Sequence, residues 1–377
     1  MTAYLIVLVV SMTVTFVMTP VARRVAFRVG AIAHPSDRTV HPVATPQMGG
    51  LAMFVGMVAA LAATWFIPQG RILYRTSSEL IATLVAGTLI FLVGLYDDVK
   101  GTIPLGKLAG QVLSAGVLVL IGVQMLYVWF PGQGIISLSA DLSVPLTILW
   151  VLAMVNAVNL IDGLDGLAAG MVAIAAGAFF LFVREAPGLY GDISPAGLIS
   201  AITVGMCIGF LPWNFNPAKI FMGDSGAMLL GLLLAVATIS GVGRNAYPPS
   251  GGDVAAFSIP VLLPLILLAI PFLDVALAIL RRVRSNKPVS HADKEHIHHR
   301  LLDIGHSHRQ AVLLMYLWSS LLAGCALAVA FIDGRVAAGI VVTVLLLVFA
   351  VTFVPRILIG NGRRSADAED ATEEVAG

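Results

Sequence analysis

The chain has 377 residues, of which 58% are hydrophobic and only 11% are charged, against roughly 25% charged residues in soluble domains. With a mean hydropathy of +0.95, the composition excludes an ordinary soluble protein and predicts an all-α polytopic membrane protein. The net charge of +1 carries no information about nucleic acid, and we expect no nucleic-acid partner.

Long apolar runs recur along the chain, and about 20 apolar residues are needed to cross a bilayer. The eleven candidate runs are residues 4–22, 49–67, 80–96, 106–123, 143–161, 165–183, 195–213, 223–240, 254–280, 311–332 and 336–358. We therefore expect about eleven transmembrane helices that form one domain over residues 1–358. Residues 359–377 are rich in Asp and Glu with little apolar content, which predicts a disordered cytoplasmic tail.

The distribution of Lys and Arg predicts the orientation of the chain. If the N-terminus is outside, 17 of these residues fall on the inner side and 5 on the outer side. Because basic loops remain in the cytoplasm, we predict an external N-terminus and a cytoplasmic C-terminus. We do not expect the first run to be a cleaved signal peptide, because it has no basic n-region and Arg23 and Arg24 follow it. On the outer side, residues 131–147 combine a glycine turn with alternating apolar and polar residues, which predicts a small exposed hairpin.

Residues 156–166 join two apolar runs and carry a regular set of polar side chains. These are Asn156, Asn159, Asp162 and Asp165, which recur every third residue and share roughly one face if the helix continues. Gly163 and Gly166 interrupt the helix and allow backbone to approach a ligand. Polar groups at membrane depth are costly and indicate a site. The alternative is a polar helix–helix seam or a water-lined pore.

The run at 80–96 is followed by Asp97 and Asp98. Adjacent carboxylates repel each other unless a cation shares them. The pair therefore indicates a Mg²⁺ or proton-transfer site, or alternatively a solvated helix end in which Lys100 is the partner. Asp274 lies within the predicted ninth span, where a carboxylate is either functional or paired with a neighbouring helix.

Residues 212–226 hold Asn, Lys and aromatic residues before a Gly-Asp-Ser-Gly sequence. Asp224 is a candidate N-cap of the following helix, whose N-terminus also suits a metal-bound phosphate. Phe221 is either a core residue or a stacking platform for a base. The short segment 45–50 is primarily a turn signal and alternatively brings backbone donors to a phosphate.

Six of the eight histidines lie within residues 291–308. The cluster lacks cysteines and matches no closed four-ligand zinc pattern. With nearby Lys and Arg, it better suits an anion or a sugar, because imidazoles and cations both donate to oxygen atoms. Carboxylates and amides elsewhere on the inner side favour Mg²⁺, or alternatively Mn²⁺. Together these features indicate a lipid phosphate that meets a water-soluble diphosphate.

Four motifs occur in an order and spacing that resemble a known family. They are Asp97-Asp98, residues 156–166, Phe221-Met222-Gly223-Asp224 and His296-Ile297-His298-His299-Arg300. Over residues 1–358 the chain resembles the polyprenyl-phosphate N-acetylhexosamine-1-phosphate transferases, in their WecA/TagO-like branch. The resemblance implies a catalytic transmembrane domain in a bacterial plasma membrane, with its site facing the cytoplasm. It also implies transfer of GlcNAc-1-phosphate from UDP-GlcNAc to a polyprenyl phosphate, with release of UMP, by a homodimer among membrane lipids.

The resemblance also implies roles for individual residues. Asp97 and Asp98 are the catalytic pair, and Asn159 and Asp224 hold Mg²⁺. Asp162, Asp165, Asn216 and Phe221 bind the nucleotide, and Lys107, His296, His298, His299 and Arg300 contact the sugar and diphosphate. Arg38 and His41 are weaker candidates for the lipid phosphate, because several relatives have Lys in this loop. The same chemistry on UDP-MurNAc-pentapeptide or UDP-GalNAc is one alternative, and a secondary transporter is the alternative class.

Overall fold

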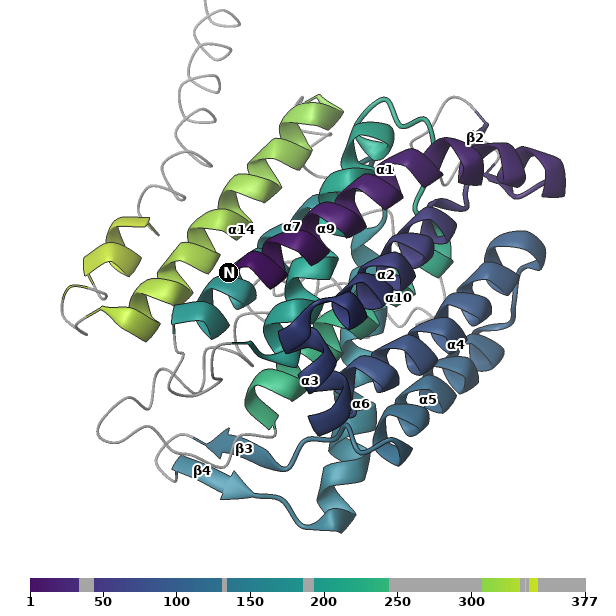
Figure 1. The fold of residues 1–377 in the computed structure, drawn as a ribbon. Helices are drawn as coiled ribbons and strands as arrows, with labels where there is room; N and C mark the ends of the chain where they lie inside the picture. Colours follow the sequence, from purple (N-terminus) through teal and green to yellow (C-terminus); the bar gives the residue numbers. More distant parts are fainter. Residues whose placement is uncertain are drawn as a thin grey trace, which may run out of the picture.

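The computed structural model describes residues 1–33, 44–130, 134–185, 193–243, 307–332, 336 and 339–344. Within them, eight helices are long and apolar enough to cross a membrane. They are α1 (Thr2–Val29), α2 (Gly49–Phe66), α4 (Glu79–Lys100), α6 (Ala140–Ile161), α7 (Leu167–Glu185), α9 (Pro195–Asn214), α10 (Gly223–Thr238) and α14 (His308–Phe331). The chain is thus a mostly helical, polytopic membrane protein (Figure 1). The predicted span 254–280 with Asp274, most of 336–358, and the tail lie outside the described residues.

Two shorter helices complete this part of the bundle. The predicted run 106–123 forms α5 (Pro104–Leu120), which is apolar but, with 17 residues, shorter than the eight candidate spans. The candidate span that contains α10 runs over Gly223–Gly241, because it includes part of the turn that follows the helix. The helix α3 (Pro68–Thr76) was not predicted, because its sequence lies in a polar connection between two apolar runs. A π-helical turn (Ile239–Gly243) extends α10.

Two small antiparallel strand pairs connect the helices. The strand β1 (Ile32–Ala33) pairs with β2 (Thr45–Pro46), and β3 (Tyr127–Phe130) pairs with β4 (Gly134–Ser137). The hairpin predicted over 131–147 is therefore present but lies earlier, because residues from 140 onward already belong to α6. Asp141 in the first turn of α6 favours this helix start, since the helix dipole attracts an acidic side chain there.

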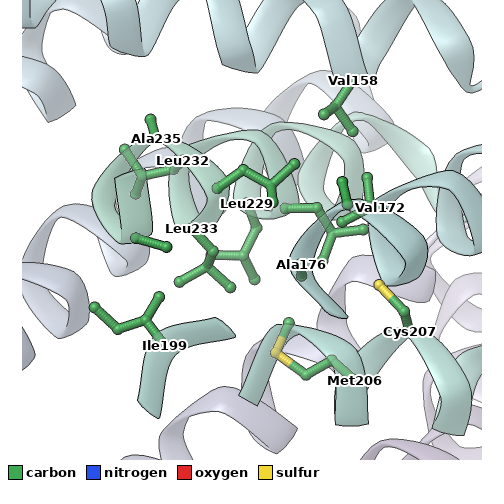
Figure 2. Close-up of a cluster of buried hydrophobic side chains, with 14 of the residues drawn as sticks. Val158, Val172, Ala176, Ile199, Met206, Cys207, Leu229, Leu232, Leu233 and Ala235 are labelled. Atoms are coloured by element: carbon green, nitrogen blue, oxygen red, sulfur yellow. The ribbon is translucent and has the colours of Figure 1, made fainter. Parts of the chain in front are cut away.

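The helix α10 occupies the centre of the bundle and packs against α2, α4, α6 and α9. Every residue from Ser225 to Thr238 is buried, as expected for a helix that is apolar on all sides. Figure 2 shows α10 side chains packed against neighbouring helices. The labelled residues include Leu229, Leu232 and Leu233 of α10, Val172 and Ala176 of α7, and Ile199 and Met206 of α9.

Close contacts at two glycines bring the start of α10 against the end of α4. A Cβ at Gly94 of α4 would collide with the backbone of Ser225. Gly223 has φ +72°, and a Cβ there would lie 2.6 Å from the Asp98 carboxylate. Only glycine tolerates both the positive φ and the approach. The N-terminus of α10 is therefore held directly beside the Asp97-Asp98 pair.

Successive helices alternate in direction, so that their connections gather at the two ends of the bundle. The β3–β4 hairpin lies at one end, and β2 lies near the other (Figure 1). The connections α4–α5, α6–α7 and α9–α10 meet at the end away from the hairpin, and α14 begins there. Motifs that are separated in the sequence thus come together at one end.

Candidate active site

A cavity of about 230 Å³ opens where these connections meet. Its lining is Gln47, Asp97, Asp98, Asn159, Asp162, Gly163, Leu164, Asp165, Asn214, Phe221, Gly223 and Asp224. The structure thus gathers seven of the predicted site residues around one space: Asp97, Asp98, Asn159, Asp162, Asp165, Phe221 and Asp224. The predicted residues Arg38, His41, His296, His298, His299 and Arg300 lie outside the described residues.

Asp98 holds the N-terminus of α10. Its buried carboxylate accepts hydrogen bonds from the Asp224 backbone N–H (2.7 Å), the Ser225 N–H (3.1 Å) and the Ser225 hydroxyl (2.5 Å). These donors belong to the first turn of α10, which lacks intrahelical partners. The sequence expectation that Asp224 caps α10 is therefore wrong. Asp98 supplies this function from another helix, and the Asp224 side chain faces the cavity.

Lys107 links the other two carboxylates. Its ammonium group forms an ion pair with Asp224 and lies 3.4 Å from the Asp97 carboxylate. Asp97 also accepts from the Thr102 backbone N–H (2.7 Å) and from the Thr102 hydroxyl. Lys100 does not partner the acidic pair as the alternative expected, because its ammonium lies over the Tyr96 ring, 5.6 Å from the centroid. Lys107, near the N-terminus of α5, therefore links this helix electrostatically to α4 and α10.

The polar set at 156–166 divides between two environments. The helix α6 ends at Ile161, and a turn over 162–166 precedes α7, so the four residues do not continue along one helical face. Asn156 exchanges hydrogen bonds with Gln111 of α5, at 2.8 and 3.4 Å. Asn156 therefore forms a polar helix–helix contact, which was the alternative interpretation of the polar residues in 156–166. Asn159 and Asp162 line the cavity instead.

Asp162 lies at the end of α6 beside three other carboxylates. Burial, together with the negative charges of Asp224, Asp98 and Asp165, raises the pKa of Asp162 to about 7. Each effect disfavours the charged form. A cation in the cavity would reverse the effect of the neighbouring charges, so this corner of the site is suited to a positively charged ligand.

Asp165 is engaged with the loop that follows α9. Its carboxylate accepts from the Asn216 side-chain amide (2.9 Å) and from the Ala218 backbone N–H (3.0 Å). Asn214 accepts from the Gly166 N–H (3.0 Å) and donates to the Ile220 carbonyl (3.1 Å). Asn216 therefore contacts Asp165 and does not line the cavity. Asp165 lines the cavity, and its carboxylate at the same time links the α6–α7 turn to the loop that follows α9.

Phe221 is held at the cavity by the segment that precedes α2. Its N–H donates to the Pro46 carbonyl (2.8 Å), and its carbonyl accepts from the Gly49 N–H (2.9 Å). The Gly50 N–H donates to the Met222 carbonyl (2.9 Å). These two glycine donors are therefore occupied within the protein, which agrees with the primary interpretation of segment 45–50 as a turn and not with the alternative that its glycines reach a phosphate. Their role is to fix the segment before α10.

Several residues at the site were not predicted. Gln47 lines the cavity and donates to the Asp98 carbonyl (3.2 Å), while Asn214, Thr102 and Ser225 fix the neighbouring segments. Ser225, Asn214 and Thr102 lie one, two and four residues from a predicted position, and Gln47 lies within the segment 45–50. Their position beside a recognised motif is the one signal in the sequence that could have identified them, although it does not distinguish a residue that supports the site from one that binds a ligand.

The donor set fits a hard divalent cation that is shared with a phosphate ligand. Among the described residues, no group of three or more His, Cys, Asp or Glu side chains is arranged to hold a metal alone. Mg²⁺ is usually held by one or two carboxylates together with substrate phosphates and waters. Asn159 and Asp224 offer oxygen atoms at the cavity wall, and the surrounding carboxylates supply negative charge.

The fold and the site together define a polytopic membrane protein with an acidic cavity at one end of its helical bundle. Residues 80–242 match the model of glycosyl transferase family 4. The chain is 41% identical over 367 residues to a decaprenyl-phosphate N-acetylglucosaminephosphotransferase of Mycobacterium tuberculosis, covering 94% of this chain and 90% of the relative.

Two further relatives extend the comparison. A probable undecaprenyl-phosphate N-acetylglucosaminyl 1-phosphate transferase of Bacillus subtilis is 36% identical over 82% of this chain and 80% of its own length. A phospho-N-acetylmuramoyl-pentapeptide-transferase of Desulforudis audaxviator is 34% identical over 63% of this chain and 73% of its own length. The chain belongs to the polyprenyl-phosphate N-acetylhexosamine-1-phosphate transferases of glycosyl transferase family 4, in their WecA/TagO-like branch.

Proposed function

We propose that the protein transfers GlcNAc-1-phosphate from UDP-GlcNAc to a polyprenyl phosphate and releases UMP. This would be the first membrane step in the synthesis of a cell-envelope polysaccharide. The observation that carries the proposal is the acidic cavity formed by the family motifs, in a chain closely similar to enzymes named for this transfer. The relative named for muramoyl-pentapeptide transfer aligns over less of this chain, which favours UDP-GlcNAc over UDP-MurNAc-pentapeptide as the donor; UDP-GalNAc is the other alternative donor.

We further propose that Mg²⁺, or Mn²⁺, is the cofactor. Asn159 and Asp224 would hold it, with the remaining positions filled by phosphate oxygens and water. When bound, the cation would neutralise charge on the diphosphate and on the departing UMP. Lys107, which contacts Asp224, would supply a second positive charge to the same phosphates.

The reaction we propose is an in-line displacement. An oxygen of the acceptor phosphate attacks the sugar-bearing phosphorus, and the bond from that phosphorus to UMP breaks. A phosphate monoester has a second pKa of about 6, so the acceptor is largely dianionic at neutral pH and needs little help from a base. Asp97 would then position the phosphates with Lys107, while Asp98 fixes Asp224 through the first turn of α10. Phe221 and the Asp165 loop would bind the uracil.

The rival route passes through an aspartyl phosphate. Incubating the purified protein with UDP-GlcNAc labelled on its β-phosphorus, without any lipid, separates the two routes. A one-step displacement leaves the protein unlabelled, because no acceptor is present. Radioactive phosphate covalently attached to the protein would contradict the direct displacement.

Topology, localisation and assembly remain proposals as well. We propose about eleven transmembrane helices in one catalytic domain over residues 1–358, an external N-terminus, a disordered cytoplasmic tail over 359–377, and a homodimer in the bacterial plasma membrane. The charge distribution in the described residues supports a cytoplasmic cavity. Within the described residues, the cavity end of the bundle carries most of the basic side chains: Arg23, Arg24, Arg28, Lys100, Lys107, Lys219 and Arg309. The opposite end carries Arg71, Arg75 and Arg184.

The orientation can be tested with a membrane-impermeant thiol reagent on intact cells. We expect the reagent to label Ser137→Cys in the hairpin and not Lys219→Cys near the cavity. The reverse pattern would contradict the proposed orientation.

The function is tested by measuring UMP release from a panel of UDP-sugars, with polyprenyl phosphate and Mg²⁺ added to the purified protein. We expect release from UDP-GlcNAc that requires both additions. Asp224→Ala and Asn159→Ala should abolish it, whereas Tyr74→Phe at the other end of the bundle should retain it. Near-normal rates in either of the first two variants at saturating Mg²⁺ would remove that residue from the metal site.

A further inference from the structure

The start of α14 contacts the two loops that form one wall of the cavity. Ser307 and Gln310 form a capping box, which fixes the first turn of this helix. His308 and Tyr316 are eight residues apart and lie on the same helical face. Both are half-buried, and each contacts the turn between α6 and α7.

His308 and Tyr316 hold two consecutive backbone groups of that turn. The Asp165 N–H donates to Nε2 of His308 at 3.0 Å, and the Tyr316 hydroxyl donates to the Gly166 carbonyl. A ring nitrogen that accepts a hydrogen bond carries no proton, so this contact requires Nε2 of His308 to be unprotonated. The Gly166 N–H is held by Asn214 (3.0 Å). Side chains from two other helices therefore set the backbone at Asp165 and Gly166.

The same helix also holds the second loop. Nε of Arg309 donates to the Asn216 carbonyl at 2.9 Å, while the side chain of Asn216 donates to Asp165 (2.9 Å). Gly170 of α7 leaves room for the Tyr316 ring, which a Cβ at that position would strike. The contact is thus closely packed as well as hydrogen-bonded.

We propose that the first turns of α14 are a positioning element for the nucleotide-binding wall, in which His308 and Tyr316 fix the Asp165–Gly166 backbone and Arg309 fixes the Asn216 loop. The assignment of this wall to the nucleotide, and the effect on KM, rest on the proposed function. The fixing of the two loops by α14 does not depend on it. His308 and Tyr316 do not line the cavity, so they act through Asp165 and are positioning residues. Their loss weakens the binding of the UDP-sugar and leaves the binding of the lipid acceptor unchanged.

The first test measures amide hydrogen exchange across residues 160–170 in the full chain in detergent. His308→Leu and Tyr316→Phe should both accelerate exchange at this turn. Tyr74→Phe is the matched control, because the Tyr74 hydroxyl donates to the Leu61 carbonyl (2.8 Å) at the other end of the bundle. Exchange in this control should equal that of the unchanged protein. Unchanged exchange in both α14 variants would overturn the proposal.

The second test measures KM separately for UDP-GlcNAc and for the polyprenyl phosphate. We expect KM for UDP-GlcNAc to rise about three- to tenfold in His308→Leu, which corresponds to one lost hydrogen bond, with no change in KM for the lipid. His308→Gln should restore the unchanged value, because its amide oxygen can accept the same hydrogen bond. Equal increases in both KM values, or no rescue by Gln, would overturn the positioning role. Failure of the unaltered protein to release UMP would refute the proposed function, while the exchange experiment would still decide the inference.

Discussion

Asp98 and Asp97 are neighbours in the sequence, and the structure gives them different tasks. Asp98 is buried and accepts three hydrogen bonds from the first turn of α10. Asp97 is partly exposed and faces Lys107 and Thr102. Replacing each by Asn removes the charge with little change in volume. The two variants should therefore lose activity for different reasons.

The size of the stability effect follows from these bonds. A hydrogen bond to a charged group is worth about 1.5–3 kcal/mol, and the Asn amide presents one acceptor where the carboxylate presented two. Asp98→Asn should therefore lower the free energy of unfolding by about 2–4 kcal/mol. In Asp97→Asn, the amide oxygen still accepts from Thr102, and a partly exposed ion pair contributes only about 0–1 kcal/mol.

The assay is thermal unfolding in detergent, with UMP release measured on the same preparations. At roughly 2 °C per kcal/mol for a long chain, Asp98→Asn should lower Tm by about 4–8 °C. Asp97→Asn should lower it by less than about 2 °C and still lose turnover. Ser225→Ala, which removes one of the three bonds to Asp98, should fall between them. An unchanged Tm in Asp98→Asn would refute the view that this carboxylate holds α10.

Three further predictions concern the surroundings of the site. Because the pKa of Asp162 is raised from 3.8 to about 7, the folded state binds this proton more tightly than the unfolded state. Without a divalent cation, the free energy of unfolding should therefore fall as the pH rises from about 4 to about 7. Calorimetry should show a flatter pH dependence of stability in Asp162→Asn, and an identical slope in the two proteins would contradict the raised pKa. Gln111→Leu should cost about 1–3 kcal/mol, because half-buried Asn156 loses its partner on α5 and keeps only the hydrogen bond to the Leu152 carbonyl. The double variant with Asn156→Leu should recover part of this loss; additive losses would argue against the pair. Gly170→Ala should lower Tm because its methyl group strikes Tyr316. Gly177→Ala, where the nearest atom lies 3.9 Å away, should not lower Tm, since alanine also favours the helix more than glycine does; equal Tm values in the two variants would contradict this packing.

The helices of the described part could be predicted because a membrane span has a strong signal. Long apolar runs leave little choice of structure, and each run within the described residues is helical. The hairpin was placed too late because the alternation in residues 138–147 is short and competes with the start of α6. The short helix α3 carries too few apolar residues for the same signal.

The sequence could predict that the acidic motifs form one site, because they share residue types and lie on the same predicted side of the membrane. It could not predict the partner of each side chain. Asn156 and Asn159 look alike in the sequence, yet one pairs with Gln111 and the other lines the cavity. Asp224 resembled a helix cap, while the capping carboxylate comes from Asp98 on another helix. Such partners depend on how distant helices pack, and no local pattern of residues encodes that. The roles assigned to these side chains in binding and catalysis stay predictions.

The central claim is that a phosphosugar, and not the sugar alone, moves to the lipid. The most direct measurement follows the two phosphorus atoms of UDP-GlcNAc, each labelled separately, after incubation with polyprenyl phosphate and Mg²⁺. Our account predicts that the β-phosphorus enters the lipid fraction and that the α-phosphorus remains in water as UMP. Recovery of both labels in water as UDP, with the sugar on the lipid, would contradict it.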